Sequence, residues 1–221
     1  MIMKTILVSF AVMLLAISSA TAQKVMNEDN AEKRTVGSFH AIEVSAGIQV
    51  IITKGDKEEL AVAASDKELI NKVETVVKNG VLKISRQSDW KFWENFKNPR
   101  IKVYVSYTNL DGLEASSGAS IKGSGIDLNK LFVHQSSGAF IELSGSADNL
   151  EVSGNSGSQF NGYDLKTVTC NADVNSGANI KVNVSKEISA KANSGGSIRY
   201  KGDGSIRDIN VNSGGSVKKQ N

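Results

Sequence analysis

A Ser-Gly motif that recurs through the second half of the chain constrains the fold more than any other feature. Each copy reads Ser/Asn-Ser-Gly, then a small residue, a variable residue and an apolar residue. Six copies occur 18 to 20 residues apart, with their glycines at Gly118, Gly138, Gly157, Gly177, Gly195 and Gly214. A flexible Ser/Gly linker would not place an apolar residue three positions after every glycine, so the motif indicates a folded repeat.

The repeat has the pattern of a β-solenoid coil. A second apolar residue precedes each motif, turn-forming residues often lie just before it, and helical periodicity is absent. Short strands of three to five residues between corners are typical of such coils. Coils stacked about 4.8 Å apart share parallel ladders and bury their inward side chains. We therefore expect an all-β fold with a parallel β-helix of about six coils, each of about 20 residues, over residues 108–221.

Two structural details follow from the repeat. The recurring glycines, including Gly138, Gly157 and Gly177, should have left-handed backbone conformations, which glycine adopts without strain. The inward side chains should form a buried stripe from coil to coil, containing Leu131, Ile141, Leu150, Phe160, Val168 and Ile180.

Residues 37–107 differ from the repeat but are also rich in β-strand patterns. Apolar residues alternate from Ile42 to Ile52, which predicts one long half-buried strand that bends near Gly47. Residues 66–73 predict a short helical turn, and Asn79-Gly80 between two apolar runs predicts a hairpin. We expect this segment to form one continuous unit with the solenoid.

The first residues have the layout of a secretory signal peptide. Lys4 precedes an apolar stretch from Ile6 to Ile17, and small residues ending in Ala-x-Ala predict cleavage after Ala22. The apolar stretch is too short to span a bilayer, so we expect no membrane span in the mature chain. Residues 1–22 are thus expected to be removed and residues 23–36 to form a flexible linker. The protein should be exported, to the periplasm, the outer surface or the extracellular space.

Charge and cysteine content exclude several functions. The formal net charge of +3 is too small to argue for a nucleic-acid partner. Cys170 is the only cysteine, so no internal disulfide can form, and its strand-like surroundings predict a small buried or half-buried side chain. The two histidines, His40 and His134, do not form a zinc motif, and we expect neither a metal nor another cofactor.

Acidic residues leave two further readings open. Four aspartates near the corners form either Asx turns or, if they converge, a calcium site: Asp127, Asp148, Asp164 and Asp208. Glu114, Glu142 and Glu151 would have to converge in a cleft for the chain to be a carbohydrate-active β-helix enzyme, a polysaccharide lyase or hydrolase. Each of these glutamates fits an outward strand position equally well. No catalytic motif is present, so the sequence favours a protein that is not an enzyme.

The candidate binding residues are the aromatic cluster Trp90, Phe92, Trp93 and Phe96. Exposed aromatic rings stack on sugars or anchor protein partners. The same segment would serve as a plug if it covered an open end of the solenoid, since solenoid ends otherwise expose inward side chains. The sequence favours the plug.

The overall pattern resembles a known family. The signal peptide, the segment FHAIEVSAGIQVIITKG, the stretch DKELINKVETVVKNGVLKI and the Ser-Gly repeats are similar to the putative autotransporter adhesin head, GIN-domain family. The Gly-Ile-Asn of the family name is here Gly47-Ile48-Gln49. The resemblance covers residues 37–217 and implies an exported β-solenoid with an adhesin-like role. The leading hypothesis is thus a non-enzymatic binding or structural module whose partner is a glycan or a cell-surface protein.

Overall fold

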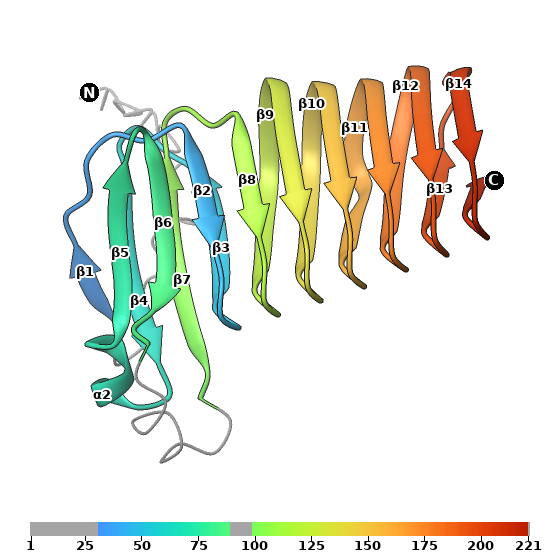
Figure 1. The fold of residues 1–221 in the computed structure, drawn as a ribbon. Helices are drawn as coiled ribbons and strands as arrows, with labels where there is room; N and C mark the ends of the chain where they lie inside the picture. The colour runs from blue at the N-terminus through green and yellow to red at the C-terminus, as the bar shows by residue number, and fades with distance from the viewer. Residues whose placement is uncertain (1–30, 89–98, 221) are drawn as a thin grey trace, which may run out of the picture.

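The computed structural model describes residues 31–88 and 99–220, and most of these residues lie in β-strands. The second half is an elongated parallel β-solenoid (Figure 1). Its strands are β8 (Gly112–Ala115), β9 (Ser120–Gln135), β10 (Phe140–Gly154), β11 (Gln159–Val174), β12 (Asn179–Ala192), β13 (Ser197–Lys201), β14 (Ser205–Val211) and β15 (Ser216–Lys219). The predicted all-β solenoid is therefore confirmed.

Parallel ladders hold equivalent residues of successive coils in register, so the core consists of continuous rows. One buried row contains Ile121, Ile141, Phe160, Ile180 and Ile198. Another contains Leu131, Leu150, Cys170 and Ile188. A slip of one residue would turn a whole row outward, so the burial of these rows specifies the register.

The predicted inward stripe is wrong at one position. Val168 is 38% exposed, and Cys170 takes the place opposite Leu150. Two outward residues, Val168 and Thr169, separate buried Thr167 from buried Cys170, so the alternation of inward and outward side chains is interrupted here. The preceding coil has the same pattern, with Asp148 and Asn149 between buried Ala147 and Leu150. Cys170 is buried, as its surroundings predicted.

Each Ser-Gly motif forms a type I′ turn. Ser137 and Gly138 have φ of 50° and 71°, and Ala139 N–H donates to Ser136 O at 3.0 Å. Gly138 N–H donates to Ser156 O of the next coil at 3.0 Å, so the interstrand ladder continues through the corner. The predicted left-handed glycines are confirmed, with φ of 72° at both Gly157 and Gly177.

The coils differ from the prediction in number and in strand length. The solenoid has about five turns rather than six coils, because six corners enclose five complete turns. Strands β9 to β12 are 14 to 16 residues long and run from one corner to the next. Bulges near glycines bend the chain where the prediction placed further corners. At Gly145, φ is 125° and a Cβ atom would overlap the backbone of Ile126.

The first half contains a coil corner that the sequence pattern hides. β2 (Ala41–Val44) and β3 (Gln49–Lys54) flank Ala46 and Gly47, which have φ of 62° and 70°. Gly47 N–H donates to Ser117 O at 3.0 Å, as at the Ser-Gly corners. The prediction of one bent strand was therefore wrong. Four residues separate the strands, an even number that preserves the alternation of buried and exposed positions across the corner.

Further strands extend the two sides of this first coil. On the β3 side lie β7 (Ile101–Tyr107), β4 (Glu59–Ala64) and β1 (Glu32–Arg34); on the β2 side lie β6 (Val81–Arg86) and β5 (Val73–Lys78). β5 and β6 form the predicted hairpin around Asn79-Gly80, and α2 (Lys67–Ile70) is the predicted helical turn. The Asp66 side chain accepts a bond from Glu68 N–H at 3.0 Å and caps this helix.

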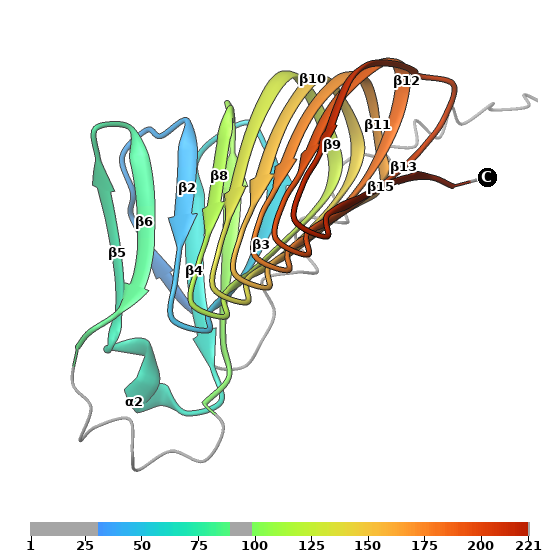
Figure 2. The ribbon, with the colours of Figure 1, turned by 45° about the vertical axis from the view of Figure 1, so that its right-hand side comes forward.

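The two ends of the molecule differ. At the N-terminal end, antiparallel pairings of β1, β4, β5 and β6, together with buried Leu69 and Ile70 of α2, cover the core. In Figure 2 the C-terminal coils come forward, and no comparable cap follows β14 and β15 within the described residues. Leu69 and Ile70 thus have no counterpart at the C-terminal end.

Part of the predicted N-terminal linker is ordered. Glu32–Arg34, inside the range 23–36, form β1, and Arg34 Nη1 and Nη2 donate to Val73 O at 2.6 Å and Ile70 O at 2.7 Å. The structure thus has a strand at residues 32–34, and the flexible linker over residues 23–36 stays a prediction. The predicted signal peptide, residues 1–22, lies outside the described residues. In the part of the chain that is described, no helix has the length and apolarity needed to cross a membrane.

Candidate functional site

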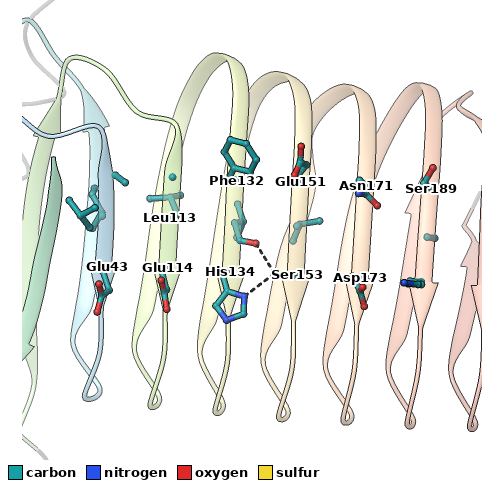
Figure 3. A pocket seen from close by; sticks show the side chains of 18 of the residues that line it. Glu43, Leu113, Glu114, Phe132, His134, Glu151, Ser153, Asn171, Asp173 and Ser189 are labelled. Carbon is teal, nitrogen blue, oxygen red and sulfur yellow. Dashed lines mark hydrogen bonds between the residues drawn. The ribbon is translucent and has the colours of Figure 1, made fainter. Parts of the chain in front are cut away.

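A shallow groove of about 700 Å³ follows the outer surface of the strand segments that lead into the corners (Figure 3). We call this surface the entry face; it comprises residues 41–44, 112–115, 130–135, 149–154, 169–174, 187–192 and 205–211. Groove-lining residues extend from Val81 on β6, next to Ala41 of the first coil, to Asp208 on the last coil. The groove therefore runs along the solenoid axis and crosses the coils.

The parallel register arranges the outward side chains of the entry face in two rows. The Phe132 row contains Phe132, Glu151, Asn171, Ser189 and Asp208. The His134 row contains Glu43, Glu114, His134, Ser153, Asp173 and Lys191. Successive members of a row are one ladder spacing apart, about 4.8 Å. The groove thus offers a repeating set of polar groups to any ligand that lies along the axis.

Local contacts orient several of these side chains. Lys130 Nζ lies 3.2 Å from Glu151 Oε1 and 4.1 Å from the centre of the Phe132 ring. His134 Nδ1 lies 2.8 Å from Ser153 Oγ in the neighbouring strand. Phe132 is 42% exposed and presents the one large apolar surface of the described groove rows. The site combines an aromatic face with hydroxyl, amide, imidazole and carboxylate groups.

The three glutamates of the enzyme hypothesis do not converge. Glu114 and Glu151 line the groove but belong to different rows and to coils that are not adjacent. Glu142 lies on another side of the coil, where Lys122 Nζ is 3.1 Å away and Asn161 Nδ2 donates to its carboxylate at 3.0 Å. The hydrogen bond from Lys122 is the main cause that lowers the pKa of Glu142. The Asn161 bond adds to the effect.

The four aspartates are likewise separate. Asp127 forms an ion pair with Lys54 at 3.4 Å, and only Asp208 lies in the groove. Among residues 31–88 and 99–220, no three His, Cys, Asp or Glu side chains gather in a way that would hold a metal ion. Of the two histidines, His134 lies in the groove, and His40 Nδ1 is 2.8 Å from Asp111 Oδ1 beside the Asn79-Gly80 turn.

The predicted aromatic cluster is not part of this site. Trp90, Phe92, Trp93 and Phe96 lie outside the described residues, so both the plug and the binding surface remain predictions. The groove is not among the predicted sites, although the sequence contains a signal for it. Phe132 and His134 alternate with the inward Leu131 and Val133, so extension of the alternation along each coil would have placed them on one outer face.

Known structures share this fold. A putative adhesin of Bacteroides fragilis superposes with a TM-score of 0.70 at 18% identity, covering 86% of this chain and 96% of that chain. A putative lipid binding protein of Parabacteroides distasonis has a TM-score of 0.50 at 20% identity, covering 87% of this chain and 98% of that chain. These similarities show the fold alone. No curated protein sequence matches the chain.

The sequence also matches a family model over most of its length. The model of the family described as putative auto-transporter adhesin, head GIN domain, matches residues 38–204. That range includes the hidden corner at Ala46-Gly47, the capping strands β4, β5 and β6, and most of the solenoid. The chain therefore belongs to the putative auto-transporter adhesin, head GIN domain family.

Proposed function

We propose that the protein is an exported, non-enzymatic binding module, an adhesin-like head domain, whose ligand is a glycan chain held along the groove of the entry face. Membership of an adhesin head family supports the general role. The observation that carries the ligand class is the pair of polar rows that repeat at every coil beside the exposed ring of Phe132. A hydroxyl-rich polymer can hydrogen-bond to such rows and stack a sugar ring on the aromatic face.

The groove favours a glycan over a lipid. An acyl chain needs a continuous apolar lining. The outward residues of both rows are polar apart from Phe132, and the apolar residues beneath them, such as Val133 and Val152, are buried in the core. When a glycan displaces water from the groove, its hydroxyl groups can form hydrogen bonds with the polar groups of both rows.

The proposed role requires export of the chain and a single folded unit. Residues 1–22 act as a signal peptide that is removed on export. Residues 37–107 and 108–221 form one unit, which the parallel pairing of β2 with β8 and of β3 with β9 supports. The mature chain then acts in the periplasm, on the outer surface or outside the cell.

A glycan array and titration calorimetry on the chain without its predicted signal peptide test this function. Phe132→Ala and Glu151→Gln should each weaken glycan binding about tenfold or more, because they remove the stacking face and a hydrogen-bonding carboxylate. Val76→Ala is the matched control, since Val76 is 58% exposed on β5 and does not line the groove. Absence of glycan binding, or equal binding by Phe132→Ala and the control, would contradict the proposal.

The enzyme alternative gives a different result in the same assays. A lyase or hydrolase would shorten the bound polysaccharide, and Glu114→Gln or Glu151→Gln would stop that cleavage while leaving binding in place. If the ligand is recovered at its original length after prolonged incubation, the groove acts as a binding site.

A further inference from the structure

The last coil exposes apolar side chains that the earlier coils bury. All seven residues of β14 are exposed. Ile206 and Ile209 lie in register with Ile188 and Ala190, which are buried, so their side chains point toward the core side of the sheet. Ile206 is 54% exposed, Ile209 38% and Val211 44%. Three of the six exposed large hydrophobic side chains in the described residues therefore lie on this one strand.

The backbone of the same coil has free hydrogen-bonding edges. Within residues 31–88 and 99–220, β14 pairs only with β12, and β15 pairs only with β13. An exposed edge that carries apolar side chains is a template for a further strand. A partner that adds a strand to β14 would satisfy the edge and cover Ile206, Ile209 and Val211 at once.

At the opposite end of the molecule the inward side chains are covered, unlike those of β14. Ile70 of α2 and Val73 of the hairpin strand β5 are buried in the cap that covers this end. The strand β1 at that end consists of Glu32, Lys33 and Arg34. Head-to-tail stacking would thus leave the apolar residues of β14 against a polar, capped end. Covering them requires another surface of the same apolar kind.

A bulge on β14 places two opposite charges side by side on the outer surface. Ser189 lies opposite Asp208, and Ile188 lies opposite Ile206, so Arg207 is the extra residue. Arg207 and Asp208 both line the outer surface, and Arg207 Nη1 lies 3.3 Å from Glu187 Oε1. The order along the strand is therefore apolar, positive, negative, apolar, from Ile206 to Ile209.

We propose that two copies of the chain pair through β14, antiparallel and about a two-fold axis that passes between Arg207 and Asp208. In this register Ile206 lies opposite Ile209 of the second copy, and Arg207 lies opposite Asp208 of the second copy. The sequence from Ile206 to Ile209 is complementary to itself only in this antiparallel arrangement. A two-fold interface of this kind closes at the dimer, because each copy has one such end.

The dimer also extends the groove. Asp208 on β14 is the last lining residue of the groove at the C-terminal end. Two-fold pairing through β14 brings the entry faces of both copies into one continuous sheet, so the two grooves meet at the interface. The dimer proposal rests on the free edge of β14, its exposed apolar residues and the order of its charged residues. It does not depend on what the groove binds.

Sedimentation velocity or light scattering on the chain without its predicted signal peptide tests the dimer. The unmodified chain should have the mass of a dimer at micromolar concentration. Ile209→Lys should convert it to a monomer, and Asp208→Arg should weaken the dimer about tenfold by placing arginines opposite each other. Exchange of the two charges in one variant, Arg207→Asp with Asp208→Arg, should restore the dimer because the opposed pairs are complementary again.

Val76→Lys on β5 is the control and should leave the mass unchanged. Circular dichroism shows whether Ile209→Lys still folds; if it does not, Asp208→Arg and the double exchange carry the test at exposed positions. A monomer at every concentration reached would overturn the proposal. So would a dimer that resists Ile209→Lys and Asp208→Arg, or one that the double exchange fails to restore.

Discussion

Replacement of Gly157 by valine tests the structural basis of the repeat. Gly157 is the second central residue of its type I′ corner, with φ of 72°. A Cβ atom at this position would meet no other atom within 4 Å. The N–H group donates to Ser176 O at 3.1 Å, and valine would keep that bond. The substitution therefore changes the backbone strain and little else.

The expected cost follows from that strain. An L-residue in the left-handed region loses about 1–2 kcal/mol relative to the right-handed region, and a β-branched residue is at the upper end. We expect Gly157→Val to lower the free energy of unfolding by at least about 1 kcal/mol. Gly157→Asn should cost only a few tenths, because asparagine enters this region readily. The two substitutions differ in strain, while neither creates a contact.

Urea unfolding followed by circular dichroism measures the difference, provided that the slope against urea is the same for all variants. Gly145→Ala gives a third comparison, since its Cβ atom would overlap the Ile126 backbone and its cost should exceed that of Gly157→Asn. Equal stability of the valine and asparagine variants would refute the argument from φ.

Four further outcomes concern buried and exposed positions of the solenoid. Leu150→Ala should lower the unfolding free energy by about 2–5 kcal/mol, since Leu150 is buried between Leu131 and Cys170. Val168→Ala should change it by less than about 0.5 kcal/mol in the same urea assay, because Val168 is on the outer surface and 38% exposed. Cys170 is buried, and burial raises the pKa of its thiol to about 12. The unfolded thiol titrates near 8.5, so the unfolded chain releases a proton first and stability should fall as pH rises from about 9 to 12. Thiol-reactive dye at pH 8 should label Cys170 only after unfolding.

The solenoid could be predicted because every repeat needs the same two features, a corner and an inward apolar residue. A residue that tolerates positive φ recurs at nearly constant spacing, and an apolar residue follows it at a fixed distance, so errors in one copy are corrected by the others. Val168 escaped this averaging. In four coils the inward residue lies seven positions before the corner glycine, at Leu131, Leu150, Cys170 and Ile188, whereas Val168 lies nine positions before Gly177.

The groove was harder to predict than the core. Inward positions are recognisable because they must be apolar, whereas outward positions accept many residue types. The Phe132 row contains an aromatic ring, a carboxylate, an amide and a hydroxyl in successive coils. Only the three-dimensional register shows that these unlike residues are neighbours. For the same reason, Glu142 could not be separated from Glu114 and Glu151 on sequence alone.

Ala46 offers a direct contrast between the sequence pattern and the structure. If residues 42–52 were one strand, Ala46→Val would be favourable and Ala46→Asn unfavourable, because β-branched residues suit strands and asparagine does not. In the structure Ala46 has φ of 62° and precedes Gly47 at a type I′ corner, where Asn-Gly is the preferred pair. The order of stability should therefore be reversed.

Because alanine in this conformation is strained, Ala46→Asn should raise the unfolding free energy by about 0.5 kcal/mol, and Ala46→Val should lower it by about 1 kcal/mol. Ala46→Ser should change it little, since serine takes this place at the six other corners. Urea midpoints of the three variants measured together settle the order. If valine proved more stable than asparagine, Ala46 would lie in a strand, and the first coil would not begin at β2.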